Sequence, residues 1–144
     1  MGMDMAPSST SFRISQEAKQ RLADRAEQEG TSATSLLERL ILEGVDTLEH
    51  PGIIHRGPEH DRRVALAAGP DVWEIVARLR ELNGDEEQRI AALAEESALH
   101  PRQIRIAVDY AAAHPEPIRE RIARNERAAE ESRRIAEQRQ ALLT

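Results

Sequence analysis

The stretch STSFRIS, residues 9–15, decides how the rest of this 144-residue chain can fold. Thr10, Phe12 and Ile14 alternate with polar side chains, and this period of two predicts a short β-strand with one apolar face. Ser15 then serves as the N-cap of a helix. No neighbouring segment offers a second strand through a hairpin turn, and a lone strand leaves its backbone groups unpaired. We therefore expect the strand to pair with its own copy, as an antiparallel ribbon in a symmetric homodimer.

Two amphipathic helices are predicted directly after the strand, over residues 16–29 and from Thr31 to Leu48. Gly30 separates them, as a glycine does where a helix ends in a left-handed residue. The second helix has a wide apolar face. We expect the strand and the second helices of both copies to share one core. The predicted residues of this dimer core are Phe12, Ile14, Leu36, Leu37, Leu40 and Ile41.

Residues 9–48 resemble the ribbon–helix–helix family of bacterial repressors and antitoxins. The resemblance rests on the alternating strand, on Ser15 and Gly30, and on the sequence TSAT, residues 31–34, which opens the second helix. It implies that the ribbon enters the major groove of DNA and that the start of the second helix binds a phosphate. The implied base-reading residues are Ser9, Ser11 and Arg13, and the implied phosphate-binding residues are Thr31, Ser32 and Ala33.

Two features depart from that family. Thr31 stands where the family usually has an apolar residue, and residues 1–49 hold five basic and nine acidic side chains, a balance of −4. DNA affinity should then be modest and should need a second dimer or help from elsewhere in the chain. The other reading of the same residues is an ordinary edge strand in a small α+β domain without a DNA role.

The second half of the chain is predicted to be helical. Residues 49–61 are rich in proline and glycine and are expected to be a linker, and residues 63–67 are a candidate short strand. Helices are expected from Gly69-Pro70 to Leu82, over 86–97, and from Pro101 onward. The last two have helix-turn-helix spacing, which would place Arg102, Gln103 and Arg105 at recognition positions. The alternative is a compact bundle with solvated arginines.

Residues 62–123 resemble the small helix-turn-helix-like domains of antitoxins encoded beside PIN-like ribonuclease toxins. The resemblance is carried by RRVALAAGPDVW, residues 62–73, and VDYAAAHP, residues 108–115. It implies that the C-terminal half holds a toxin. The charged tail, 115–144, would bind in a groove of that partner as a helix. The candidate residues are Ile118, Arg119, Ile122, Arg124 and Ile135. The other reading is an exposed helix stabilised by Glu–Arg pairs four residues apart.

Composition narrows the remaining possibilities. Twenty basic and 26 acidic residues give a net charge of −6, so any DNA contact must be local. The absence of cysteine excludes disulfides and thiolate chemistry. His50, His55 and His60 lack the spacing of metal ligands on a helix, and no nucleotide-binding or Ser–His–Asp pattern is present. We expect no metal, no cofactor and no enzymatic activity. No apolar run approaches the length of about 18 residues that spans a membrane, so no membrane partner and a cytoplasmic location are expected.

The sequence thus predicts a mainly α-helical protein: a flexible leader (1–8), a dimeric ribbon–helix–helix domain (9–48), a linker (49–61), a helix-turn-helix-like domain (62–114) and a helical tail (115–144). The predicted function is that of a DNA-binding antitoxin and autorepressor of a bacterial toxin–antitoxin operon. Its partners would be operator DNA, a second copy of the chain and a cognate toxin. The alternatives are a stand-alone transcriptional regulator whose C-terminal half senses a ligand or forms oligomers, and a structural adaptor that does not bind nucleic acid.

Overall fold

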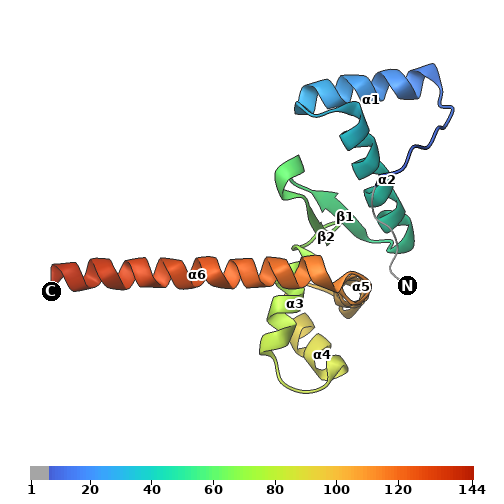
Figure 1. The fold of residues 1–144 in the computed structure, drawn as a ribbon. Coiled ribbons are helices and arrows are strands. Elements are labelled where there is room, and N and C mark those ends of the chain that lie inside the picture. Colours follow the sequence, from blue (N-terminus) through green and yellow to red (C-terminus); the bar gives the residue numbers. More distant parts are fainter. Residues whose placement is uncertain (1–6) are drawn as a thin grey trace. The chain divides into compact units, whose positions relative to one another are not determined.

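The computed structural model describes residues 7–144, so most of the predicted leader lies outside the described residues. The described chain is mainly helical, as expected, with one small antiparallel sheet (Figure 1). It divides into two compact units, which we call unit 1 (up to Gly44) and unit 2 (Val45–Thr144). No helix among residues 7–144 combines the length and the apolar character that a membrane span requires.

Unit 1 contains α1 (Gln16–Glu29) and most of α2 (Ala33–Glu49). The bounds of α1 confirm the helix predicted over residues 16–29. The prediction succeeded because neighbouring residues in the chain determine both ends of this helix. The Ser15 hydroxyl accepts a hydrogen bond from the amide of Ala18 at 3.1 Å, and Gly30 ends the helix with a φ of 68°. Residues 7–15 form neither helix nor strand in this single chain. The strand predicted at residues 9–15 is therefore not formed in the single chain. The two strands of the described chain lie elsewhere and pair with each other.

In unit 2 the last turns of α2 are followed by a hairpin, whose first strand lies within the segment 49–61 that the sequence analysis expected to be a linker. β1 (Ile53–Arg56) pairs antiparallel with β2 (Arg63–Leu66), and a short 3-10 helix, η1 (Glu59–Asp61), lies between them. The candidate strand at 63–67 is confirmed as β2. The proline and glycine residues of 49–61 flank β1 without interrupting it, because a four-residue strand fits between Gly52 and Gly57.

Three short helices, α3 (Val72–Glu81), α4 (Glu86–Glu96) and α5 (Pro101–Ala113), and the long α6 (Pro115–Leu143) complete unit 2. α3 begins two residues later than expected, because Asp71 forms a capping box with Glu74. Gly84, with a φ of 106°, and the cap residue Asp85 separate α3 from α4. Pro115 stands at the start of α6, a position where its missing amide proton costs nothing.

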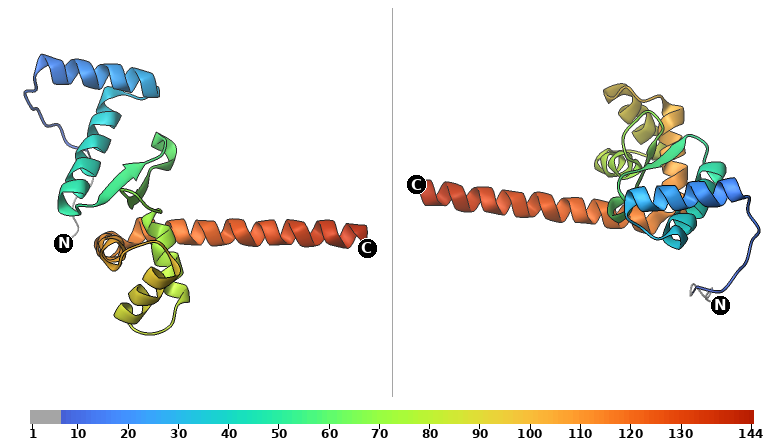
Figure 2. Two further views of the ribbon diagram at one scale, coloured as in Figure 1. Left: turned by 180° about the vertical axis from the view of Figure 1, so that it is seen from behind. Right: turned by 90° about the horizontal axis from the view of Figure 1, so that it is seen from above.

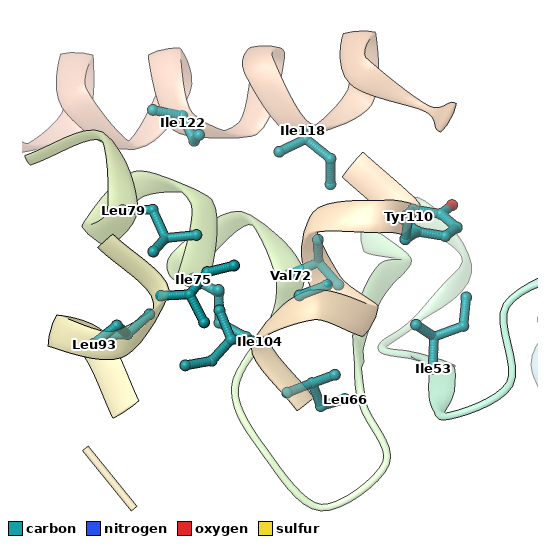
Figure 3. Close-up of a cluster of buried hydrophobic side chains, with 12 residues drawn as sticks. Ile53, Leu66, Val72, Ile75, Leu79, Leu93, Ile104, Tyr110, Ile118 and Ile122 are labelled. Carbon is teal, nitrogen blue, oxygen red and sulfur yellow. The ribbon is translucent and has the colours of Figure 1, made fainter. Parts of the chain in front are cut away.

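One hydrophobic core holds unit 2 together (Figure 3). Ile53 and Leu66 of the hairpin contribute to it together with buried residues of all four helices. Ile118 and Ile122, in the first turns of α6, are only 7% and 3% exposed. The first turns of the predicted tail therefore belong to the core of unit 2, whereas the sequence analysis expected Ile118 and Ile122 to bind a partner. From Arg124 onward every residue of α6 is exposed, and this half of the helix extends away from the rest of unit 2 (Figure 2).

Candidate dimer and nucleic-acid interface

The apolar side chains of unit 1 are mostly uncovered. Among its described residues only Ala26 and Leu36 are buried. Phe12 is 80% exposed, and Ile14, Leu37, Leu40 and Ile41 are each between 41% and 53% exposed. Five of the six predicted dimer-core residues are thus exposed in the single chain, and the sixth, Leu36, is the one large side chain that α1 and α2 enclose between them.

An apolar hollow of about 670 Å³ lies on this same face of unit 1. Its walls include Ile14 from the extended segment, Leu22 from α1, and Leu37 and Leu40 from α2. A unit of about 40 residues with two buried side chains lacks the core that independent folding requires. The exposed face and the hollow are therefore the apolar part of unit 1 that remains accessible in the single chain.

The two helices of unit 1 are held to each other by an ion-pair cluster at the turn between them. Arg39 of α2 donates to both carboxylate oxygens of Glu29 at 2.9 and 3.2 Å, and Arg25 donates to the same carboxylate at 3.3 Å. The hydrogen bond from Arg39 is the main reason that the pKa of Glu29 is lowered. Gly30 provides the turn itself. The ion pairs and the turn thereby fix α1 and α2, and with them their apolar residues, relative to each other.

The predicted DNA-reading residues lie outside regular structure. Ser9, Ser11 and Arg13 are all exposed in the extended segment, and the single chain does not assemble them into a ribbon. At the start of α2, the Ser32 hydroxyl accepts a hydrogen bond from the amide of Ser35 at 3.1 Å and so acts as the N-cap. The first amide groups of the helix, beginning with that of Ala33, have no acceptor within the helix, as at any helix N-terminus.

The helix-turn-helix outline in unit 2 is occupied by internal contacts. The side chain of Gln103 accepts a hydrogen bond from the amide of His100 at 2.8 Å, which completes the cap of α5. Arg105 pairs with Glu87 of α4 at 2.7 Å, and this hydrogen bond raises the pKa of Arg105. Two of the three candidate recognition side chains therefore stabilise the bundle, and Arg102 is simply exposed. These contacts favour the compact-bundle reading.

The candidate toxin-binding residues fall into three groups. Ile118 and Ile122 lie in the core of unit 2, so they are not available to anchor a partner. Arg119 pairs with Glu116 within its own helix at 3.0 Å, and Arg124 pairs with Asp61 at 3.3 Å. Of the five, only Ile135 is an exposed apolar side chain.

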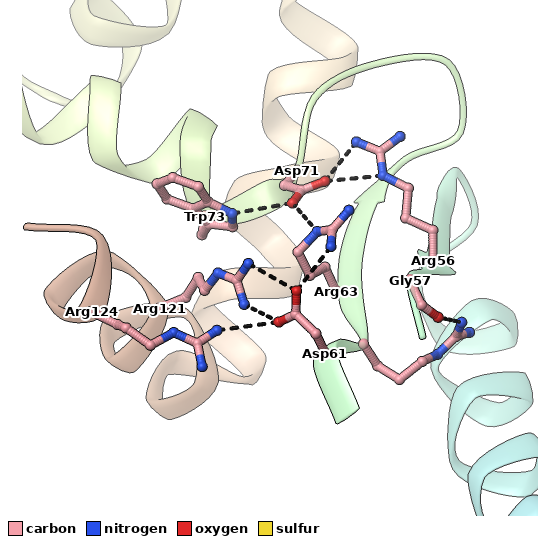
Figure 4. A network of polar contacts seen from close by, with 9 residues as sticks. Arg56, Gly57, Asp61, Arg63, Asp71, Trp73, Arg121 and Arg124 are labelled. Carbon is pink, nitrogen blue, oxygen red and sulfur yellow. Dashed lines mark hydrogen bonds and ion pairs between the residues drawn. The ribbon is translucent and has the colours of Figure 1, made fainter. Parts of the chain in front are cut away.

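A network of arginines and two aspartates joins the hairpin to α3 and α6 (Figure 4). Asp71 accepts from Arg56 at 2.6 Å, from Arg63 at 2.8 Å and from the indole of Trp73 at 3.2 Å. Burial raises the pKa of Asp71, but the hydrogen bonds from the two arginines outweigh it, so the pKa lies below its usual value.

Asp61 is the second acceptor in this network. It lies in η1 and accepts hydrogen bonds from Arg121 and Arg124 of α6 and from Arg63 of β2. The hydrogen bond from Arg121, with that from Arg63, lowers the pKa of Asp61 to about 2. The sequence analysis assigned Arg124 to a partner, and the structure instead pairs it, together with Arg121, within unit 2.

A second polar cluster surrounds Asp46, in the last turns of α2. His55 and His114 place their Nε2 atoms 3.3 and 3.6 Å from its carboxylate, and the Tyr110 hydroxyl donates to it at 3.3 Å. The ring of His50 meets those of Tyr110 and His114 edge-on. Sequence spacing missed this cluster because its members come from three separate segments, the end of α2, β1 and the end of α5. Among residues 7–144, no three histidine, aspartate or glutamate side chains are arranged to hold a metal ion.

Comparisons with protein-family models, with curated proteins and with solved structures find no match to this chain.

Proposed function

We propose that this chain is a DNA-binding antitoxin and autorepressor of a bacterial toxin–antitoxin operon, built on a ribbon–helix–helix homodimer. The observation that carries the proposal is the uncovered apolar face of unit 1, next to an extended segment without a strand partner. A second copy supplies both missing elements at once. Its strand pairs with residues 9–15, and its second helix covers the hollow.

The energetics favour this assembly. Burying a large aliphatic or aromatic side chain contributes roughly 1.5–3 kcal/mol, and each copy would bury several of them on that face. A symmetric dimer also places the polar faces of two strands side by side, so that Ser9, Ser11 and Arg13 of each copy project together. A two-stranded ribbon fits the major groove, where an arginine can bind guanine with two hydrogen bonds.

Because Ile118 and Ile122 are buried, we propose that the distal half of α6 binds the partner protein. Ala128, Ile135 and Leu142 are spaced by seven residues, so they share one side of the helix, and all three are exposed. Such a stripe suits an amphipathic helix that lies in the groove of another protein. The resemblance of residues 62–123 suggests a PIN-like ribonuclease as that partner, in which case the enzymatic activity belongs to the partner.

The experiment that tests DNA binding combines sedimentation of the full chain with gel shifts on DNA from its own promoter. We expect a dimer and a shift that weakens as salt increases. Arg13→Ala should weaken the shift by about tenfold or more, because a bidentate contact to guanine is worth about 1–3 kcal/mol. Arg134→Ala, which removes an exposed arginine from the distal half of α6, is the control and should leave the shift unchanged. A folded monomer at micromolar concentration, or equal effects of both variants, would refute the ribbon.

A stand-alone regulator that senses a ligand is the second candidate function. The observation that favours it is an apolar hollow among the helices of unit 2, which is considered next.

A further inference from the structure

Unit 2 contains a second hollow, of about 650 Å³, between α3, α4, α5 and α6; we call it the four-helix hollow. Its floor reaches the core side chains Leu79, Ile90 and Ile118. Val76 and Val108 form apolar walls, and both are only partly buried in the described chain. Pockets of this volume, apolar lining and position between the helices of a bundle are typical of small-molecule sites.

The rim of the four-helix hollow is cationic in a chain that is acidic overall. Arg80, Arg89 and Arg119 line it, against one carboxylate, Glu86. Arg89 is held in place by hydrogen bonds to the carbonyl oxygens of Gly84 and Leu79, at 2.8 and 3.3 Å. These bonds leave one terminal nitrogen of its guanidinium for a ligand.

The other two arginines are also open to a ligand. Arg80 is exposed and forms no ion pair within residues 7–144, and the pair of Arg119 with Glu116 lies on the surface of α6, where such pairs are weak. The cation at the rim with the fewest internal contacts is therefore Arg80. It stands beside Arg119, since a smaller hollow between α3 and α6 is lined by the same two arginines.

We propose that the four-helix hollow binds a small amphipathic carboxylate, with its apolar body against Leu79, Ile90 and Ile118 and its carboxylate between Arg80 and Arg119. Guanidinium groups match a carboxylate with paired hydrogen bonds. The core side chains at the floor suit a narrow alkyl or aryl chain, and the arginines at the rim suit its charged end. The proposal concerns unit 2 alone, so its failure would leave the DNA-binding proposal untouched.

The test uses decanoate, below its micelle-forming concentration, added to the ¹⁵N-labelled full chain and followed by amide NMR spectra. We expect saturable shifts at Gly84, Ala111 and Ala112, which line the hollow. The double variant Arg80→Gln/Arg119→Gln should weaken binding by about tenfold or more, because charge-assisted hydrogen bonds are lost. Ala112→Phe, at an exposed position that tolerates a larger side chain, should fill the hollow and abolish the shifts. Lys19→Gln, which removes an exposed cation of α1, is the matched control and should bind as the unmodified chain does.

Several results would overturn the proposal. Absence of saturable binding would do so, and so would shifts confined to residues 12–41, since the uncovered face of unit 1 would then be the site. Equal binding of decyltrimethylammonium would show an apolar hollow without preference for an anion. Unchanged affinity in both hollow variants would place the site elsewhere. The unmodified chain could also fail to bind decanoate while the hollow variants lose capture of the protein encoded next to this gene. That result would assign the hollow to a protein partner.

Discussion

At the scale of single residues, Asp71 connects three elements of unit 2, namely β1, β2 and α3. It caps α3 and accepts hydrogen bonds from two arginines of the hairpin and from Trp73. Its role as a cap was not predicted, since the predicted helix began earlier, at Gly69-Pro70. Its arginine partners lie 8 and 15 residues away in the chain, and no local pattern predicts such pairs.

Asp71→Asn should destabilise unit 2 by about 2–3 kcal/mol, because it leaves two arginines facing a neutral group in a largely buried site. The measurement is urea unfolding followed by the fluorescence of Trp73, the chain's one tryptophan. Glu116→Gln, which breaks the exposed pair with Arg119, is the control and should change the free energy of unfolding by less than about 0.5 kcal/mol. Similar losses in both variants would contradict the importance of the buried network.

Asp61 should make the stability of unit 2 depend on pH in the acid range. Because the folded state lowers the pKa of its carboxyl from 3.8 to about 2, its contribution is complete above pH 3.8 and is lost as the pH falls toward 2. The measurement is the difference in urea midpoint between the unmodified chain and Asp61→Asn, followed from pH 7 to pH 2. We expect the unmodified chain to be more stable at pH 7 and the difference to vanish near pH 2. A difference that grows on acidification would have the wrong sign.

At the scale of elements, the sequence predicted the helices whose ends are determined by cap residues close to them in the chain. α1 is the example, with Ser15 at one end and Gly30 at the other. β1 was missed, because the surrounding prolines and glycines resemble a linker and the pairing with β2 depends on residues seven to 13 positions away. The apolar face of α2 follows directly from its periodicity, and this part of the candidate interface was predictable. The burial of Ile118 and Ile122 depends on how the helices pack, which periodicity does not determine.

Gly30→Ala should destabilise the turn between α1 and α2. An added Cβ would meet no atom within 4 Å, so the cost is that of a positive φ alone, about 1 kcal/mol. Gly30→Asn is the matched variant and should cost less, because asparagine tolerates this conformation better. The measurement is thermal unfolding of the full chain by circular dichroism. An alanine variant as stable as the unmodified chain would show that the turn can relax.

At the scale of the whole molecule, the proposed function concerns two of the apolar surfaces that remain uncovered in residues 7–144. One is the face of unit 1, and the other is the stripe on the distal half of α6. In the proposed function, a second copy of the chain covers the face of unit 1, and a partner protein covers the stripe on α6. A chain that ends after residue 126 separates the two assignments.

Such a truncated chain should keep the buried core of unit 2, since every buried residue of α6 lies before position 123. It should still form dimers and shift promoter DNA, but it should lose capture of the protein encoded by the adjacent gene. The measurement is co-purification after co-expression with the full-length and the truncated chain, with Ile135→Asp as the single-residue version. Full capture by the truncated chain would place the partner surface elsewhere.

The exposed half of α6 also determines how far from the core of unit 2 a captured partner protein would lie. A helix rises 1.5 Å per residue, so residues 124–143 reach roughly 30 Å beyond the last buried turn. A protein grasped near the tip of this arm would be tethered to unit 2 without needing to touch its helices. Shortening the arm by whole turns, four residues at a time, would then draw the captured protein inward in steps of roughly 5–6 Å until the two bodies collide.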